Sequence, residues 1–135
     1  LVLLYPPIDP QAQTSSRAEY ASGPYLSTAA ADAMWNAYLG SPANAASSLA
    51  VPSRAVTLRG LPPTLILTAA CDPLRDEGED YGRQLRDAGV PTTVQRVDGV
   101  IHGTFSMSGV VPRSGEFYDA ITMFVRSLRA PALHA

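Results

Sequence analysis

Two residues of types that work together in proton transfer occur in the second half of the chain. Asp72 ends the run "TLILTAACD", which is rich in apolar and β-branched residues, and His102 lies in "GVIHGTF". An imidazole that donates a hydrogen bond to a carboxylate is held in one tautomer, so its other nitrogen is free to take a proton. The carboxylate also stabilises the imidazolium that then forms. Asp72 and His102 are therefore candidates for a carboxylate–imidazole pair that acts as a general base.

The elements around these two residues are predicted to bring them together. Residues 64–70 and 92–97 read as strands, and residues 76–88 between them read as a helix. Asp72 and His102 are separated by about the length of one strand–helix–strand unit, roughly 30 residues. A right-handed crossover places two such strands side by side. Because functional groups collect beyond the carboxyl ends of parallel strands, we expect both side chains on one rim of the sheet.

Simpler interpretations of the same residues stay open. An Asp before Pro at a strand end is more often a turn or cap residue, and a lone His beside Gly is more often structural. Asp76 and Asp98 are rival partners for His102, although Asp76 also suits the first turn of a helix. Cys71 is expected to be a small buried thiol and not a nucleophile. Composition and spacing alone predict no more than a candidate pair.

The order of the elements predicts an α/β fold with a parallel sheet. Residues 1–5 form a short apolar run stopped by Pro6 and Pro7, which fits a buried strand. Strands that alternate with helices at this spacing are typical of a parallel sheet with covering helices. The last helix is expected to start after Ser114 and to carry an apolar stripe made of Phe117, Ile121, Phe124, Val125 and Leu128.

A further helix is predicted across "AAADAMWNAYL", residues 29–39. Ser27 or Thr28 can cap its start, and Gly40 ends it. Its spacing predicts one apolar face, formed by Ala31, Met34, Trp35 and Tyr38. From composition alone, these side chains are assigned to core or cap packing before specific recognition.

The composition suits one globular domain and excludes some partners. The chain has 135 residues, of which 46% are hydrophobic and 16% charged, and its formal net charge is −2. Nucleic acid is an unsuitable partner, because phosphate binding needs clustered Lys and Arg. No run of eighteen apolar residues occurs, so we expect no membrane span. The single cysteine favours a reducing, cytoplasmic setting.

The start of the chain suggests that it is part of a longer protein. It opens directly on "LVLLYPPID", a strand of the kind that is buried between neighbours, without a preceding Met or leader. We therefore expect residues 1–135 to form a single partial domain. Residues 6–60 would be an excursion between strands with cap or pocket helices, and residues 61–135 a βαβ unit followed by a helix.

Two long motifs resemble a known family. The stretches "LPPTLILTAACDPLRDEGEDYGRQLRDAGV" and "GVIHGTF" are similar to the carboxyl-terminal half of the hormone-sensitive-lipase-like esterases, which have the α/β-hydrolase fold. "LVLLYPPID" resembles the sixth strand of that fold. The resemblance implies that Asp72 is the acid and His102 the base of a Ser-His-Asp triad. The family's His-Gly-Phe appears here as His-Gly-Thr-Phe, so Thr104 puts the packing behind His102 in question.

The other parts of such a site do not occur in this sequence. No Gly-x-Ser-x-Gly motif surrounds any serine, and the family's His-Gly-Gly-Gly motif is absent as well. In this fold the nucleophile precedes the acid, and both motifs belong upstream of a strand like residues 1–5. We therefore expect a missing amino-terminal segment to supply them, and we expect the 135-residue chain alone to be inactive.

The resemblance implies a carboxylesterase or lipase-like hydrolase acting on a small acyl ester, with no metal or organic cofactor. Met34, Trp35 and Tyr38 would then contribute to substrate binding, and a homodimer would form through the strand at residues 92–97. A non-catalytic ligand-binding or scaffold relative is the alternative, and cleavage of a peptide or lactone is another. The residue at the nucleophile position decides between an enzyme and a binder.

Overall fold

Three parallel strands form the centre of the molecule. The computed structural model describes residues 1–129, and within them the strands pair in the order β1-β2-β3. The strands are β1 (Val2–Leu4), β2 (Thr64–Cys71) and β3 (Thr92–Ile101). The predicted parallel α/β fold is confirmed for this part of the chain.

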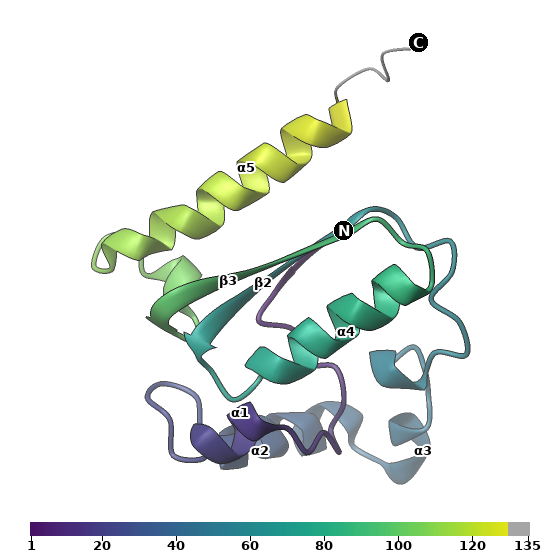
Figure 1. Ribbon diagram of the computed structural model, residues 1–135. Coiled ribbons are helices and arrows are strands. Elements are labelled where there is room, and N and C mark those ends of the chain that lie inside the picture. The colour runs from purple at the N-terminus through teal and green to yellow at the C-terminus, as the bar shows by residue number, and fades with distance from the viewer. Residues whose placement is uncertain (130–135) are drawn as a thin grey trace.

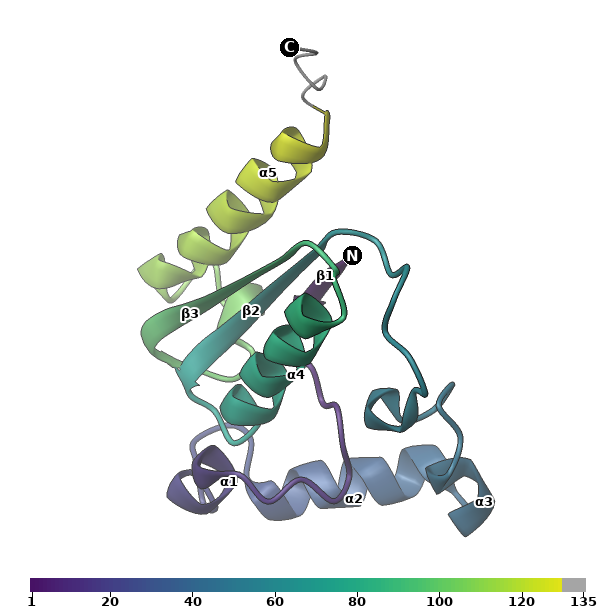
Figure 2. The ribbon, with the colours of Figure 1, turned by 45° about the vertical axis from the view of Figure 1, so that its right-hand side comes forward.

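Helices cover both faces of the sheet. The α-helices are α1 (Ser15–Glu19), α2 (Thr28–Leu39), α3 (Pro42–Ala45), α4 (Arg75–Asp87) and α5 (Gly115–Arg129). Short 3-10 turns span η1 (Pro52–Arg54), η2 (Thr104–Ser106) and η3 (Pro112–Ser114). Helix α4 packs on one face and α5 on the other (Figure 1). Helices α1 and α2 lie beyond the carboxyl ends of β2 and β3 (Figure 2), where the candidate residues are.

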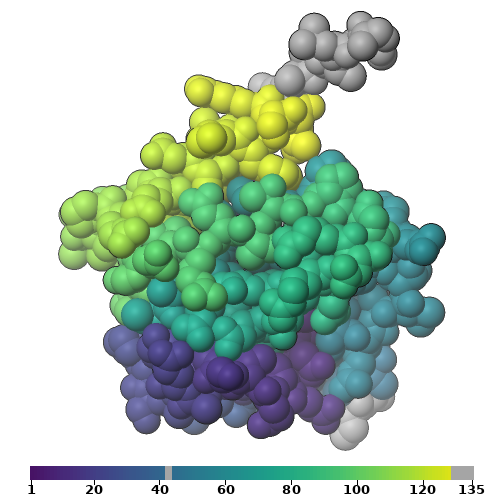
Figure 3. All heavy atoms as spheres, viewed as in Figure 1, coloured from purple at the N-terminus to yellow at the C-terminus, as the bar shows by residue number. Residues whose placement is uncertain are grey.

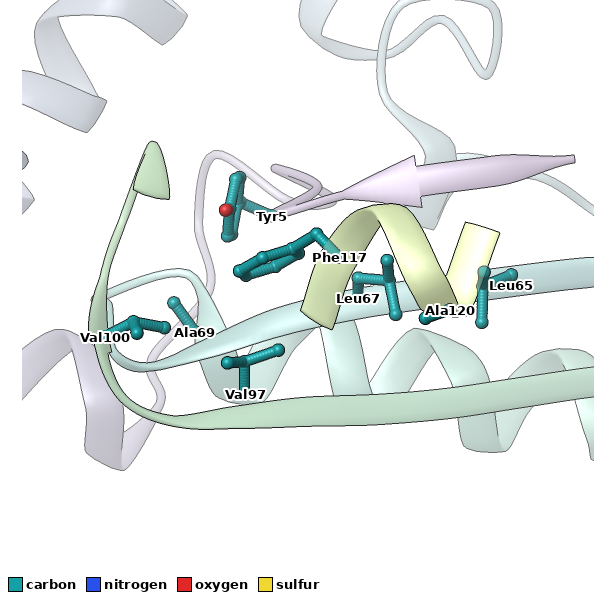
Figure 4. Packing of buried hydrophobic residues seen from close by; sticks show 8 residues of the cluster. All are labelled: Tyr5, Leu65, Leu67, Ala69, Val97, Val100, Phe117 and Ala120. Atoms are coloured by element: carbon teal, nitrogen blue, oxygen red, sulfur yellow. The ribbon is translucent and has the colours of Figure 1, made fainter. Parts of the chain in front are cut away.

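The middle strand β2 is buried on both faces, which explains its mostly apolar sequence. Side chains alternate between the two faces of a strand. Leu65 and Leu67 point to the α5 side and pack with Phe117 (Figure 4). Ile66 points to the α4 side and packs with Leu85. Because helices cover both faces, the residues that point to either side are buried, as in other parallel sheets with helices on both sides.

The third strand is longer than predicted. The strand was predicted to span residues 92–97 and to be followed by a loop from Asp98, whereas β3 continues to Ile101. The pairing with β2 shifts register near the end of both strands, and Gly99 has a φ of 66° there. A bulge accommodates these extra residues and bends the strand. His102 therefore follows a strand directly and does not lie within a long loop.

The predicted ends of two helices are confirmed. The Ser27 Oγ accepts a hydrogen bond from the Ala30 N–H at 3.1 Å, which caps the start of α2. Gly40 ends this helix in the left-handed conformation, with a φ of 62°. Gly89, with a φ of 83°, follows α4 in the same conformation.

The buried face of α2 differs from the predicted one. Ala31, Trp35 and Leu39 are buried, whereas Met34 and Tyr38 are each 64% exposed. The prediction of a single apolar face was therefore wrong for Met34 and Tyr38. The helix lies at the surface, and these two side chains face open space beside the core instead of the core itself.

The apolar stripe of α5 is covered for part of its length. Phe117 is completely buried, and Ile121 and Phe124 pack against the same cluster. Val125 and Leu128 belong to the predicted stripe but are 40% and 51% exposed, so the stripe continues beyond the part that packs on the sheet. The helix runs past the sheet, and its end stands out from the body of the molecule (Figures 1 and 3).

Candidate active site

The side chains of Asp72 and His102 are in contact at the carboxyl ends of β2 and β3. His102 Nδ1 lies 2.8 Å from Asp72 Oδ2. The Asp72 side chain is 1% exposed and that of His102 is 22% exposed. An ionised carboxylate can only accept hydrogen bonds, so this contact requires the His102 tautomer with its proton on Nδ1. In that tautomer Nε2 is left free to take a proton.

The same carboxylate also holds the turn between β2 and α4. The Leu74 N–H donates to Asp72 Oδ1 at 2.8 Å, and the Arg75 N–H donates to the Asp72 carbonyl at 3.1 Å. Helix α4 begins at Arg75. The turn interpretation and the pair interpretation of Asp72 are thus both correct, because each carboxylate oxygen serves one of them.

The two rival carboxylates are engaged elsewhere or exposed. Asp76 Oδ2 accepts the Ser16 N–H, and Asp76 Oδ1 accepts from Arg75 Nε, both at 2.8 Å. Burial opposes ionisation of Asp76, but these partners hold its pKa below the usual value. Asp98 is an exposed residue of β3. Asp72 is therefore the carboxylate that meets His102.

The ring of Tyr5 forms the packing beside His102. The two ring centroids are 4.9 Å apart, with an angle of 46° between the rings. Thr104 is buried, and its Oγ1 donates to the Ile101 carbonyl at 2.9 Å, which shapes the turn after β3. The Phe105 N–H donates to the Tyr5 hydroxyl at 2.8 Å. Tyr5 is not among the residues predicted for the site, although its place at the carboxyl end of the first strand was a signal.

Cys71 is only partly buried, whereas a small buried thiol was expected. It is the last residue of β2, where the pairing with β3 shifts register. Its neighbour Asp72, and not Cys71, makes the hydrogen bond to His102.

An apolar cavity opens beside the pair. Its volume is about 560 Å³, within the range of sites for small organic ligands. Its lining includes His102 together with Met34, Trp35 and Tyr38 of α2. The three residues from α2 thus line the same cavity as the imidazole of His102. The rest of the lining is mostly apolar.

Part of this lining was not singled out from the sequence. Leu26 precedes α2, Leu49 lies in the connection before η1, and Leu74 follows Asp72 in the turn before α4. These leucines are isolated in the sequence and follow no period, so only the tertiary fold reveals that they share a cavity.

The described residues contain no cluster suited to a metal ion and no membrane-spanning helix. No three His, Cys, Asp or Glu side chains in residues 1–129 are grouped as metal ligands would be. None of the helices in this part of the chain has the length and apolar character needed to cross a bilayer.

Comparison with known proteins identifies the family. Residues 1–106 match the family described as alpha/beta hydrolase fold. The chain is 38% identical over 106 residues to the carboxylic ester hydrolase LipN of Mycobacterium tuberculosis, and 46% identical over 65 residues to the esterase LipI of the same organism. The first alignment covers 78% of this chain and the second 48%.

A solved structure extends this similarity to the fold. The hyperthermophilic esterase of Pyrobaculum calidifontis superposes with a TM-score of 0.84 at 38% identity, over 94% of this chain. The chain belongs to the α/β-hydrolase family, in its hormone-sensitive-lipase-like branch. The alignments span only 28% of LipN, 20% of LipI and 42% of the Pyrobaculum chain.

Proposed function

We propose that the protein is a carboxylic ester hydrolase that transfers an acyl group through a serine, with Asp72 as the acid and His102 as the base. The 2.8 Å contact between Asp72 Oδ2 and His102 Nδ1 beside an apolar cavity carries this proposal. The named relatives are esterases, which supports the same class of reaction. The nucleophilic serine is supplied from outside these 135 residues, since they contain no Gly-x-Ser-x-Gly.

Each residue has one role in this mechanism. Nε2 of His102 takes the proton of the serine hydroxyl as that oxygen attacks the ester carbonyl, and then gives it to the leaving alkoxide. In the second half, His102 takes a proton from the water that attacks the acyl carbon. It gives this proton to the serine oxygen as the acyl–serine bond breaks, which releases the acid and restores the serine. Asp72 stays ionised, orients the imidazole and stabilises its charged form. These steps need no metal or organic cofactor.

The cavity indicates a substrate with an apolar group. Met34, Trp35 and Tyr38 present aliphatic and aromatic surface within reach of the same space as His102. Burial of an acyl chain or an apolar alcohol against such surface is favourable by about 25 cal/mol per Å². We therefore assign these three residues to substrate binding.

The test is hydrolysis of p-nitrophenyl esters by the natural polypeptide that carries these residues. We expect His102→Ala to lower kcat by about a million-fold and Asp72→Asn by about ten-thousand-fold. Asp98→Asn is the matched control, because it removes an exposed carboxylate close to His102 in the sequence. Full activity of either His102→Ala or Asp72→Asn would contradict the proposal.

The 135-residue chain by itself should hydrolyse these esters no faster than buffer. It carries an acid and a base but no serine in a Gly-x-Ser-x-Gly turn, and losing the nucleophile costs about as much as losing the whole triad. Turnover by the pure chain that disappears in His102→Ala would show that the nucleophile is among these residues.

A ligand-binding relative without catalysis is the alternative. The apolar cavity of about 560 Å³ would serve such a protein as well. The two functions give different results in the assay above. An intact protein that binds apolar esters without turnover, and that carries no serine at the nucleophile position, would be a binder.

A further inference from the structure

Two tyrosines share a backbone conformation that is unusual for their type. Tyr5 has a φ of 48° and Tyr25 a φ of 69°, and they are the two non-glycine residues with positive φ in residues 1–129. A bulky side chain is strained in this region. Such strain persists only where the surroundings enforce it, and it gathers at functional sites.

Both tyrosine rings lie against the same imidazole. The Tyr5 ring centroid is 4.9 Å from that of His102, and the Tyr25 ring centroid is 6.3 Å away with an angle of 22° between the rings. These separations are within the range of aromatic pairs. The two residues with strained backbone, Tyr5 and Tyr25, thus both contact the side chain of the candidate base, His102.

Tyr5 holds the region after β3 in two ways. Its ring contacts both His102 and Phe117, and the Phe117 ring centroid is 5.2 Å from that of Tyr5. Its hydroxyl accepts the Phe105 N–H, three residues beyond His102. Burial raises the pKa of Tyr5 to about 12, so the hydroxyl keeps its proton at neutral pH. Tyr5 therefore restrains the imidazole and the backbone that carries it.

Tyr25 acts from an exposed position. It is 70% exposed, so its ring contributes little to the core. A Cβ at Gly103 would lie 2.7 Å from Tyr25 Cε1, which means that the ring rests on the residue next to His102. Gly103 itself has a φ of 80°. The Tyr25 ring therefore lies on the turn that carries His102.

We propose that Tyr5 and Tyr25 are positioning residues for His102, which keep its ring in the plane that holds Nδ1 on Asp72 and leaves Nε2 free. This proposal rests on the proposed function for its catalytic meaning. A ring held by one hydrogen bond can still rotate away from its partner, whereas two neighbouring aromatic rings limit that rotation.

The first test measures the imidazole directly, in the 135-residue chain. The chain has two histidines, so His134→Gln assigns the ring signals of His102 in NMR spectra of 15N-labelled protein. We expect a single tautomer and a slowly exchanging, downfield Nδ1 proton in the parent chain. Tyr5→Leu and Tyr25→Ala, which remove the rings beside His102, should broaden or abolish that proton signal and mix the tautomers.

Two controls separate positioning from general loosening. Tyr81→Phe changes a buried tyrosine of α4 in the other core cluster, and Tyr25→Phe keeps the ring beside His102. Both should leave the His102 signals unchanged. If Tyr5→Leu does not fold, Tyr25→Ala still decides, because the Tyr25 side chain is exposed. Parent-like His102 signals in a folded Tyr25→Ala chain would overturn the proposal.

The second test uses the intact protein. We expect Tyr5→Leu and Tyr25→Ala to lower kcat by about 10-fold to 100-fold with KM changed by less than about twofold, because misplacement of a catalytic group acts on the chemical step. An intact parent that hydrolyses no ester, while the NMR differences remain, would refute the proposed function and leave the positioning intact. Active variants with parent kcat would refute the positioning alone.

Discussion

Glu77 of α4 has a carboxyl group buried between the helix and the segment after β1. It is 4% exposed, and Oε2 accepts the N–H groups of Ile8 at 3.3 Å and Asp9 at 3.1 Å. Oε1 is buried without a hydrogen-bond partner among the described residues. Burial raises the pKa of Glu77 to about 7, and it outweighs the two N–H groups and the nearby Arg17, which favour the charged form.

This carboxyl group should make stability depend on pH near neutrality. In the unfolded chain Glu77 titrates near 4.5, so between pH 4.5 and pH 7 the folded state keeps a proton that the unfolded state has released. The free energy of unfolding therefore falls as pH rises through this window, by on the order of 3 kcal/mol from this group. Glu77→Gln should remove that part of the pH dependence.

Denaturant unfolding at pH 5 and pH 8 measures the effect. The difference in free energy between the two pH values should be smaller in Glu77→Gln than in the parent. Glu116→Gln, which changes a carboxylate on the exposed start of α5, should keep the parent difference in this window. An unchanged pH dependence in Glu77→Gln would mean that the buried carboxyl group is already ionised at pH 5.

At the scale of single residues, the sequence predicted the pair but not its surroundings. Asp72 and His102 stand out because each follows a strand and because their spacing matches one βαβ unit. Tyr5 and Tyr25 do not stand out, since a tyrosine in a strand or loop has many ordinary roles. Their closeness to His102 depends on the crossing of segments that are about 100 and about 80 positions away, which no local pattern encodes.

Helix α4 packs closely on the sheet at Gly82. A Cβ at this position would lie 2.3 Å from Val94 Cγ2 of β3, which is closer than two carbon atoms can approach. We expect Gly82→Ala to lower the free energy of unfolding by about 1–3 kcal/mol, because the overpacking outweighs the better helix propensity of Ala. Thermal or denaturant unfolding of the 135-residue chain gives the value.

The same position offers a rescue. Val94→Ala in the Gly82→Ala background removes the methyl groups that clash, so the double variant should lose less stability than the two single variants predict together. Gly115→Ala is the control, because a Cβ there meets nothing within 4 Å. Simple additivity of Gly82→Ala and Val94→Ala would contradict the packing described for α4.

At the scale of elements, the sequence predicted types better than ends. The three strands and the helices α2, α4 and α5 lie where they were predicted, whereas the short helix α3 falls in a stretch that was predicted as a connection. The end of β3 was misplaced because Asp98 and Gly99 are typical of turns, whereas here Gly99 takes part in a bulge. Met34 and Tyr38 were predicted to pack in the core, but they are exposed and line the cavity. The helical period alone does not distinguish a core residue from a residue that lines a cavity.

The sheet as a whole has two edges in the described part of the chain. Strands β1 and β3 each pair on one side, with β2. Unpaired strand edges are templates for association. We expect the 135-residue chain to self-associate, with β3 as the pairing edge of a homodimer. Light scattering with size-exclusion chromatography should give a mass above the 14.3 kDa of one chain.

A charge on the edge strand tests this expectation. Gln95→Lys places a positive charge on an exposed position of β3, so it should shift the equilibrium toward the monomer. Gln84→Lys places the same charge on an exposed position of α4 and should leave the mass unchanged. Equal masses for the two variants would place the contact away from β3.

The two carboxylate oxygens of Asp72 have different partners, which affects how the residue can vary during evolution. One oxygen fastens the start of α4 and the other meets His102, so folding alone is enough reason to retain the residue. A relative without catalytic activity would still keep an aspartate at this place, whereas its histidine would be free to vary. Among relatives, retention of the histidine is therefore a better indicator of catalytic activity than retention of the aspartate.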